Sequence, residues 1–370
     1  MKNIAIVGAG AAGLFSATLL SQREDFSVTI FEKAQKIGTK LRASGGGRAN
    51  ILNTNIKPAY YNHPEFIESL LKKVDYHIIR DEFTRMGLRM AEDEEGRVYP
   101  ATFFSQTVID VLLNRLSSVN FVTDYEVKVL RKKNEKWQVN ESGRLYDVVL
   151  LASGSPAGMI AKNRQSYNGY LSDLKVKQEN LEASLVGFVL EKYPKELSGC
   201  RAKAAVSLLQ NGEKVYSEIG EVIFKDDGVS GIVVMNVSAH YNRLKNKANC
   251  SLSFNFLFDE DTLDVAAYER RFGNLAGLLH PKLNKIHQKN GFDLRNFQMK
   301  IVGVYDLEFA QVCHGGIALE EVGRDFELHR FPGLFAVGEL LDIDGVCGGY
   351  NLFFAFASAY CAAHKILKIK

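Results

Sequence analysis

Cysteine is scarce in this chain, and no two cysteines have a spacing typical of a metal or redox motif. The five residues are widely separated: Cys200, Cys250, Cys313, Cys347 and Cys361. An odd number without a Cys-x-x-Cys pair does not predict a disulfide framework, a zinc site or a redox pair, and we predict no metal. Reduced thiols of this kind are typical of a cytoplasmic protein.

Long apolar runs and an excess of one charge are also missing. No apolar stretch reaches the length that a bilayer span needs. The 370 residues carry a formal net charge of only +3, and their one conspicuous basic run is Arg131-Lys132-Lys133. Beside a predicted hairpin turn, such a run is typical of a solvated face. We expect a soluble cytoplasmic protein with neither a membrane nor a nucleic-acid partner, and the oligomeric state stays open.

The first strand, turn and helix carry the main motif. Four apolar residues, Ile4–Val7, lead into Gly8-Ala9-Gly10-Ala11-Ala12-Gly13, and a helical pattern follows. In a dinucleotide fingerprint the first glycine allows the turn, the second lets the backbone approach the pyrophosphate, and the third lets the helix pack on the strand. Glu32 ends the second strand, where its carboxylate can accept from both ribose hydroxyls and disfavours NADP. A secretory signal beginning at Lys2 is the alternative, and it does not explain the glycine spacings.

Two later segments carry glycines at places where a ligand can approach the backbone. Ser44-Gly45-Gly46-Gly47-Arg48-Ala49-Asn50 predicts a loop whose amides crowd a phosphate or ring, with a flexible surface loop as the alternative. The buried strand 146–151 ends in Ala152-Ser153-Gly154. Because ligands bind beyond the carboxyl ends of parallel strands, these small residues would let a cofactor pass close to the backbone.

In the closing segment a strand, an acidic residue, a run of glycines and a helix follow one another in that order. Gly338-Glu339 follows a strand, Asp344 lies in the next loop, and Gly348-Gly349-Tyr350-Asn351-Leu352 opens an apolar helix. In flavin folds that bind two nucleotides, such an acid can bind ribitol or ribose, and the helix dipole can stabilise charge near flavin N1 and O2. A terminal strand and helix that only close the sheet would not need the glycine pairs.

The middle of the chain has a different pattern of predicted secondary structure. Short β-rich pieces separated by turn signals predict a small sheet or barrel on the substrate side: 183–190, 204–210, 215–224, 232–237 and 250–257. Helical patterns at 262–272 and 275–289, with Pro281 as a break or a helix start, predict an inserted helical part. A chain of this length is expected to form two or three domains.

Three segments carry a resemblance: the glycine run Gly8–Gly13, Lys40-Leu41 with Ser44–Asn50, and Gly338-Glu339 through Gly349–Leu352. Together they resemble the BaiN-like family of bacterial FAD flavoproteins. The match continues through Asp227–Gly231 and His314-Gly315-Gly316. The resemblance implies an α/β fold: a glutathione-reductase-type FAD-binding Rossmann domain with an inserted β-rich substrate domain and a small helical domain. The implied ranges are 1–165 with 318–370 for FAD, 166–240 with 298–317 for substrate, and 241–297 for the helical insertion.

The glycines, the strand ends and the resemblance together predict one set of FAD-binding residues. The set is Gly8, Gly10, Ala11, Ala12, Gly13, Glu32, Lys33, Lys40, Leu41, Ser44, Gly45, Gly46, Gly47, Arg48, Asn50, Val127, Ala152, Gly154, Gly338, Glu339, Asp344, Gly349, Tyr350, Asn351 and Leu352. Candidate residues for the substrate pocket are Arg48, Asn50, Tyr350 and His314, with a structural histidine as the alternative for His314. No catalytic base is assigned.

Within the family the closest resemblance is to aminoacetone oxidases, which oxidise a small aminoketone with oxygen. It implies an FAD-dependent amine oxidase that passes a hydride from a small amine or aminoketone to flavin N5. The imine product would hydrolyse, and oxygen would become hydrogen peroxide. One complete Gly-x-Gly-x-x-Gly is present, so a dedicated NAD(P)H domain is not expected. Two alternatives stay open: an NAD(P)H-dependent flavin reductase of an unsaturated carbonyl compound, and a flavin-binding regulatory or RNA-modifying partner protein.

Overall fold

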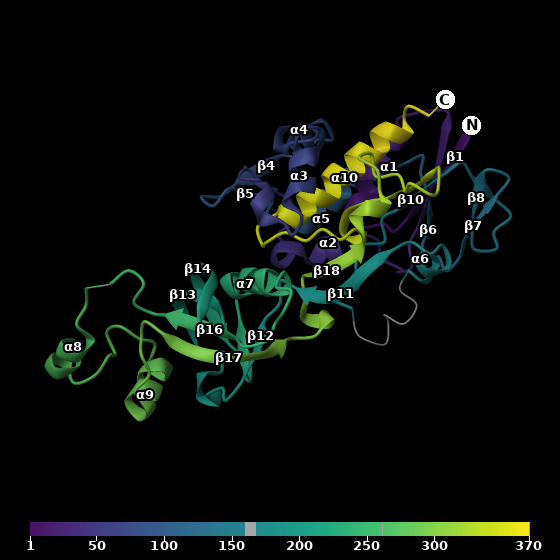
Figure 1. Ribbon diagram of the computed structural model, residues 1–370. Helices are drawn as coiled ribbons and strands as arrows, with labels where there is room; N and C mark the ends of the chain where they lie inside the picture. The colour runs from purple at the N-terminus through teal and green to yellow at the C-terminus, as the bar shows by residue number, and fades with distance from the viewer. Residues whose placement is uncertain (160–167, 261, 370) are drawn as a thin grey trace. The chain divides into compact units, whose positions relative to one another are not determined.

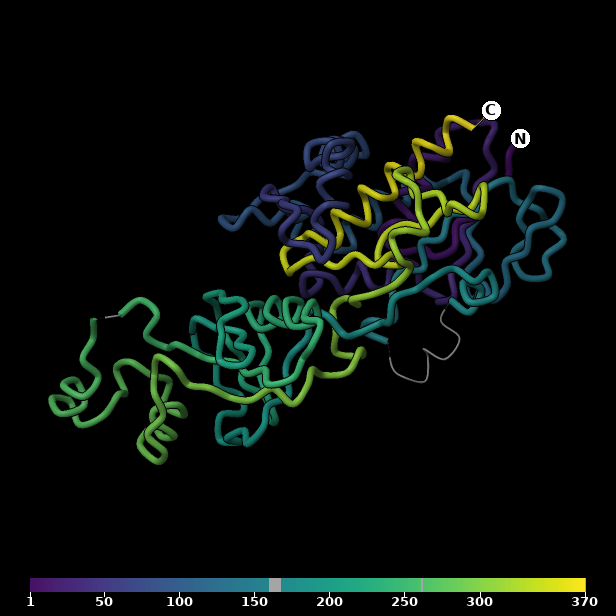
Figure 2. Tube along the Cα trace, viewed as in Figure 1, coloured from purple at the N-terminus to yellow at the C-terminus, as the bar shows by residue number. Residues whose placement is uncertain are grey.

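The computed structural model describes residues 1–159, 168–260 and 262–369. The chain forms two compact units, one from Met1–Leu181 with Cys313–Lys370 and the other from Glu182–Val312. Both chain ends belong to the first unit (Figure 1), and Figure 2 traces the backbone through each. Within the described ranges, no helix combines the length and the apolar character that crossing a membrane requires.

The first unit is built on a parallel sheet in the strand order β19-β10-β1-β2-β6. Its strands are β1 (Lys2–Val7), β2 (Phe26–Phe31), β6 (Asn120–Val122), β10 (Val148–Leu151) and β19 (Leu334–Ala336). The apolar run Ile4–Val7 lies in β1 and is buried, as expected for a parallel strand covered on both faces. The predicted Rossmann fold, assembled from both ends of the chain, is confirmed.

Two apolar helices, α1 (Ala11–Leu20) and α10 (Tyr350–Ile366), pack against each other. They come from opposite ends of the chain, and neither has a broad polar face because most of their residues are buried. Phe15 of α1 lies with its ring centroid 5.3 Å from that of Phe83 and 5.2 Å from that of Phe356. This aromatic cluster places the core of the first unit around the two helices.

Smaller elements complete the first unit. A three-stranded sheet has the order β3-β5-β4, and a second three-stranded sheet is the antiparallel meander β7-β8-β9. The elements are α2 (Thr39–Ala43), η1 (Ser44–Gly47), β3 (Leu52–Asn53), η2 (Pro58–Tyr60), α3 (Pro64–Leu71), α4 (Tyr76–Arg85), β4 (Met90–Glu92), β5 (Arg97–Pro100), α5 (Ser105–Leu113), β7 (Leu130–Lys133), β8 (Lys136–Val139), β9 (Leu145–Tyr146), α6 (Gly169–Asp173), η6 (Leu319–Glu321) and η7 (Gly338–Leu340). In a separate two-stranded sheet, β11 (Gln178–Ser184) pairs with β18 (Val312–Ile317).

The second unit is a closed antiparallel barrel in the order β12-β15-β14-β13-β16-β17. Its strands are β12 (Phe188–Leu190), β13 (Arg201–Gln210), β14 (Glu213–Phe224), β15 (Gly228–Ser230), β16 (Cys250–Asn255) and β17 (Phe297–Val304), and the short helices η4 (Lys195–Leu197) and η5 (Leu307–Phe309) flank it. The turn at Asn211-Gly212 joins β13 to β14, with φ of 52° and 84° at the two residues. Positive φ at both positions is the geometry that Asn-Gly favours in a hairpin.

One predicted strand is a helix. The stretch 232–237 reads as a strand because valine and isoleucine dominate it, but it forms the first part of α7 (Ile232–Asn242). The helix packs on β14, and Val233, Val234 and Val237 are buried there. Burial against the barrel outweighs the small intrinsic preference of β-branched residues for strands.

The helical part of the second unit is shorter than predicted. Between β16 and β17 the chain forms α8 (Val265–Phe272) and α9 (Pro281–Asn290), and of the two roles predicted for Pro281 the structure has the helix start. The expected helical domain 241–297 is too long, because β16 within it is a strand of the barrel. The unit boundaries fall at 181/182 and 312/313, not at 317/318, and the predicted boundary at 165/166 lies outside the described residues.

Candidate functional site

The glycine turn after β1 has space for a ligand on one side and none on the other. A Cβ on Gly8 would lie 2.4 Å from the Ala152 carbonyl oxygen, and one on Gly13 would lie 2.0 Å from the Gly8 oxygen. A Cβ on Gly10 would meet nothing within 4 Å. Gly8 and Gly13 are therefore required by packing, while the open backbone at Gly10 fits a pyrophosphate at the amino end of α1.

A cleft, which we call the strand-end cleft, borders the carboxyl ends of three parallel strands. Four predicted cofactor residues line it, namely Gly8, Glu32, Lys33 and Val127, together with Val7, Phe31, Tyr125, Glu126, Ser153, Asn168 and Tyr170. Glu32 accepts hydrogen bonds from Ala9 N at 2.8 Å through Oε2 and from Ala34 N at 2.9 Å through Oε1. The carboxylate thus braces the glycine turn, and each oxygen keeps acceptor capacity for a ribose hydroxyl.

Two polar residues of the strand-end cleft, Asn168 and Tyr170, were missed from the sequence, and they lie beside Ser153. Tyr170 Oη donates to Asn168 Oδ1 at 2.8 Å and lies 3.1 Å from Ser153 Oγ. Burial raises the pKa of Tyr170 well above its usual value, so the phenol stays neutral. Asn168 Nδ2 is buried and has no hydrogen-bond partner among the residues that the structure describes. An unpaired buried amide is costly in a folded chain, and a ligand acceptor in the cleft would satisfy it.

A second polar group joins segments from distant parts of the chain. Lys40 Nζ lies 2.7 Å from both carboxylate oxygens of Glu339, so two predicted cofactor residues contact each other directly. Ser155 Oγ donates to Glu339 Oε1 at 2.6 Å, and Cys313 N donates to the same oxygen at 3.3 Å. Burial raises the pKa of the Cys313 thiol to about 11. The thiol is therefore protonated at neutral pH and does not serve as a nucleophile.

The glycine loop after α2 is anchored to the amino end of α10. Gly45 and Gly46 have φ of 57° and 64°, values that glycine adopts without strain. With the Asn50 amide oriented to suit its neighbours, Nδ2 donates to Leu52 O at 2.9 Å and Oδ1 accepts from Gly349 N at 3.1 Å. Asn50 therefore ties the loop to the residue that caps α10.

The other pocket candidates have separate surroundings. Tyr350 is buried, and its ring centroid lies 4.9 Å from that of Tyr60. The Arg48 guanidinium lies 5.6 Å from the centroid of the Tyr99 ring, a cation–π distance. Tyr350 and Asn50 thus lie at the amino end of α10, while Arg48 is held over an aromatic ring of β5.

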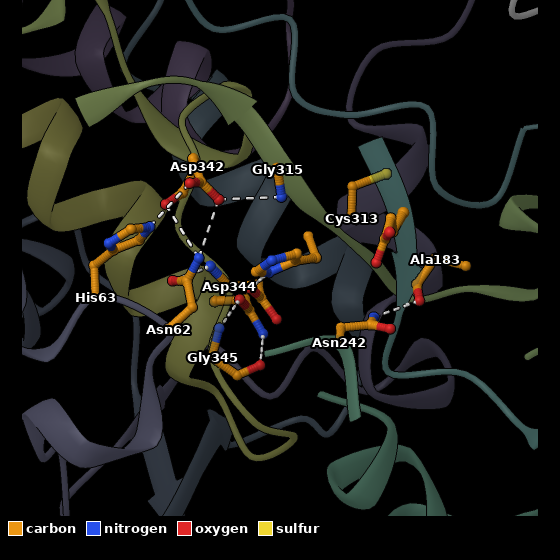
Figure 3. A network of polar contacts seen from close by, with 12 residues as sticks. Asn62, His63, Ala183, Asn242, Cys313, Gly315, Asp342, Asp344 and Gly345 are labelled. Carbon is orange, nitrogen blue, oxygen red and sulfur yellow. Dashed lines mark hydrogen bonds and ion pairs between the residues drawn. The ribbon is translucent and has the colours of Figure 1, made fainter. Parts of the chain in front are cut away.

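His314 belongs to a network of two histidine–aspartate pairs. His314 Nδ1 lies 2.8 Å from Asp344 Oδ1, and His63 Nε2 lies 2.9 Å from Asp342 Oδ2. Asp342 Oδ1 also accepts from Asn62 Nδ2 at 3.1 Å and from Gly315 N at 3.1 Å. Figure 3 shows these donors converging on Asp342.

The network holds the Asp342 carboxylate ionised. Burial by itself would raise the pKa of Asp342, but the hydrogen bond from His63, the charges of His63 and His314, and the Gly315 N–H together lower it below its usual value. Asp344 was predicted as a cofactor residue, whereas His63, Asn62 and Asp342 were missed. The sequence signal available for Asp342 was the segment Asp342-Ile343-Asp344 before Gly345, because two acids beside a glycine-rich loop are typical of a site. No such signal pointed to His63.

A single family model matches nearly the whole chain. The model described as "HI0933-like protein Rossmann domain" matches residues 2–365, and the chain belongs to that family. The predicted flavoprotein family is thereby confirmed in its coarse form: the chain is a flavin-dependent oxidoreductase with a Rossmann-type FAD-binding fold. Amine oxidation and the individual cofactor contacts stay predictions.

Particular relatives align over almost the whole chain. The 3-dehydro-bile acid delta(4,6)-reductase of Clostridium scindens is 27% identical over 402 residues, with 98% of each chain covered. A ribosomal RNA dihydrouridine synthase of Haemophilus influenzae is 25% identical, with 98% of this chain and 97% of the relative covered. The 3-ketosteroid delta1-dehydrogenase of Sterolibacterium denitrificans, solved with 1,4-androstadiene-3,17-dione, has a TM-score of 0.53 at 12% identity, with 99% of both chains covered. That last likeness concerns the fold alone.

Proposed function

We propose that this protein is an FAD-dependent reductase that saturates a C=C bond conjugated to a carbonyl group. One observation carries the proposal: the two kinds of full-length relative differ widely in substrate, yet their names describe the same bond change. A 3-dehydro-bile acid with 4,6 unsaturation has double bonds next to a ketone, and dihydrouridine is uridine reduced beside a ring carbonyl. The shared chemistry is hydride and proton addition across an electron-poor double bond.

The arrangement of the first unit supports FAD as the flavin. The open backbone at Gly10 and the strand-end cleft suit the pyrophosphate and the adenosine. Lys40 with Glu339, the Ser44–Asn50 loop and the amino end of α10 would hold the ribityl chain and the ring. A flavin without adenosine would leave Glu32 and the Asn168 amide without a ligand partner.

Bound flavin would supply the hydride, and the residues of this chain would supply position and a proton. Glu32 would orient the adenosine ribose, and Lys40 would balance the charge of Glu339 beside the cofactor. The amino end of α10 would stabilise negative charge through its dipole. The His–Asp network would hold an imidazole in a fixed orientation at this end of the site.

Oxidation of a small amine or aminoketone such as aminoacetone, with oxygen as the acceptor, is the second candidate. The observation in its favour is the single complete dinucleotide motif, because an oxidase needs no second nucleotide domain. In this reaction the flavin would accept a hydride from the amine, whereas in the reductase it would donate a hydride to the substrate. A reductase must instead receive NAD(P)H transiently at the flavin ring.

Anaerobic half-reactions separate the two candidates. The purified flavoprotein is mixed with NADH, NADPH, amines and aminoketones while the visible absorbance of the flavin is followed, and the reduced protein is then mixed with conjugated enones or a uridine-containing ribosomal RNA transcript. Bleaching by NAD(P)H and reoxidation by a conjugated carbonyl support the reductase. Bleaching by an amine only, with peroxide formed on admission of oxygen, contradicts it and supports the oxidase.

A pair of glycine variants tests the cofactor site itself. An added side chain at Gly10 or at Gly143 meets nothing within 4 Å of its Cβ, so both Gly10→Val and Gly143→Val should leave the fold intact. Only Gly10 borders the proposed pyrophosphate position. We expect Gly10→Val to lose bound FAD on gel filtration while Gly143→Val retains it, and equal retention would argue against this position for the pyrophosphate.

A further inference from the structure

We propose that the first unit carries a second binding site, for the phosphate group of a small ligand, in a pocket beside the carboxyl end of α10. Three basic residues line this pocket, Arg324, His329 and Lys365, and we call it the basic pocket. Its volume is about 240 Å³. Pockets that enclose a drug-sized ligand hold about 300–1,000 Å³, so this one suits a phosphate on a small organic body and not a dinucleotide.

The basic pocket lies away from the proposed cofactor site. Lys365 is in the last turn of α10, whereas the glycines and Tyr350 are at its amino end. A helical rise of about 1.5 Å per residue puts about 20 Å between the two ends. Pro332 also lines the pocket and precedes β19, which places it at the amino edge of the parallel sheet. Nucleotides bind beyond the carboxyl edge, so the basic pocket is a separate site.

The three basic side chains have no acidic partner. Arg324, His329 and Lys365 make no side-chain hydrogen bond or ion pair with any residue that the structure describes. A Cβ on Gly323 would lie 3.5 Å from Cε1 of His329, so the imidazole lies against the backbone next to Arg324. Guanidinium, ammonium and imidazole groups all donate hydrogen bonds. A phosphate has enough acceptor oxygens to serve all three, and charge-assisted bonds to it are strong.

The two acids that line the basic pocket already have partners. Asp325 Oδ1 lies 2.9 Å from Lys73 Nζ, and Glu327 Oε1 accepts from Gly333 N at 2.8 Å. With Lys73 included, three cations therefore face two carboxylates before the imidazole is counted. The remaining positive charge favours an anionic ligand over a neutral or cationic one.

The turn that carries Arg324 is fixed by the core. Phe326 has a φ of 66°, a value that a bulky side chain rarely adopts. Its ring is only 1% exposed and makes an edge contact with Phe66, with the ring centroids 5.9 Å apart. Gly323 N donates to Glu327 O at 2.8 Å and closes the turn. Because the backbone is already ordered, little conformational freedom is lost there when a ligand binds.

A helix end by itself explains only one of the three bases. Lys365 lies close to the partial negative charge at the carboxyl end of α10, which favours a lysine there without any ligand. Arg324 and His329 lie in turns outside any helix, so the helix dipole does not account for them. The shared feature of the three residues is the pocket that they line.

Calorimetric titration of the FAD-loaded protein tests the site. The probes are inorganic phosphate and ribose 5-phosphate, with ribose and sodium chloride of equal ionic strength as blanks. Arg324→Gln and Lys365→Gln should each weaken phosphate binding about tenfold, the factor that loss of one charge-assisted hydrogen bond produces. Two matched controls remove the same charges at exposed positions outside the pocket, Lys368→Gln and Arg80→Gln. Both should bind like wild type, and an unchanged thermal midpoint shows that each variant is folded.

Hydrogen exchange locates the bound ligand without any turnover. Amides of residues 323–329 should exchange more slowly with ribose 5-phosphate than without it, and Arg324→Gln should abolish the difference. Exchange in the glycine turn 8–13 should stay the same, because that turn belongs to the proposed cofactor site. None of these readouts involves reduction of a substrate, so this inference is tested independently of the proposed function.

Three results would overturn the proposal. One is the absence of binding at millimolar phosphate and ribose 5-phosphate. Another is equal weakening in Lys368→Gln and Lys365→Gln, because surface charge in general would then explain the binding. The third is a single-stranded RNA that binds through Arg324 while ribose 5-phosphate does not, which would replace the small ligand with a polyanion.

Discussion

Asp342 allows a stability prediction whose size can be worked out bond by bond. Its Oδ1 accepts from Asn62 Nδ2 and Gly315 N, and its Oδ2 accepts from His63 Nε2. Asp342→Asn keeps one oxygen for the two bonds on Oδ1 and loses the charge-assisted bond to His63. Such a bond is worth about 1.5–3 kcal/mol. Because His63 is 41% exposed, screening reduces the expected loss to about 1–2 kcal/mol.

Asp342→Ala should cost more, because it removes all three bonds and leaves the Gly315 N–H without its acceptor. An unsatisfied buried donor adds about 1–3 kcal/mol, so the total loss of stability should reach about 3–5 kcal/mol. Urea unfolding at neutral pH measures both variants against wild type. Amide exchange at Gly315 gives a local reading, and should be fastest in Asp342→Ala.

The sign of the pH dependence follows from the lowered pKa of Asp342. The unfolded carboxyl has a pKa of about 3.9, so the ionised group stabilises the fold above that pH and loses its contribution as the pH falls through the lower folded value. The stability gap between wild type and Asp342→Asn should therefore shrink on acidification. A gap that widens toward acid pH, or equal stability of the asparagine and alanine variants, would refute the reasoning.

Three more changes test the cofactor site and the core. Gly13→Ala places a Cβ 2.0 Å from the Gly8 oxygen, so α1 must shift, and we expect a lower thermal midpoint and weaker flavin retention; an unchanged midpoint would count against this packing. Lys40→Met breaks a pair whose lysine is 43% exposed, so stability should change by less than about 1 kcal/mol while flavin retention falls; retention equal to wild type would remove Lys40 from the site. Phe15→Ala should cost about 3–5 kcal/mol in urea unfolding because the ring is fully buried, and a loss below about 1 kcal/mol would show that the core collapses around the gap.

Much of the first unit could be predicted from the sequence because its signals are local. Gly8, Gly10 and Gly13 lie within one strand-turn-helix, and the spacing of the three can be read from that segment alone, although the backbone that excludes a side chain at Gly8 belongs to Ala152. The apolar strands and the Asn211-Gly212 hairpin are likewise fixed by neighbouring residues. The strand predicted at 232–237 was wrong because its helical state depends on packing against β14, which lies outside the segment.

In the candidate site, too, residues with a local sequence signal were predicted and residues that depend on distant contacts were missed. Glu32 was predicted at the strand-end cleft from its place after a strand, and it lines that cleft. Ser155 and His63 were missed, since each gains its role from a partner far away in the chain. Ser155 meets Glu339, and His63 meets Asp342, contacts that no periodicity or spacing encodes.

The sequence alone therefore determined the kind of ligand: a dinucleotide, from glycines whose spacing is a property of a single turn. Only the tertiary structure decided which side chains accompany it, because hydrogen bonds act over about 3 Å and depend on how loops from both chain ends come together. His314 shows the difference. In the sequence it is one histidine before two glycines, and in the fold its Nδ1 lies 2.8 Å from Oδ1 of the buried Asp344, thirty residues further along the chain.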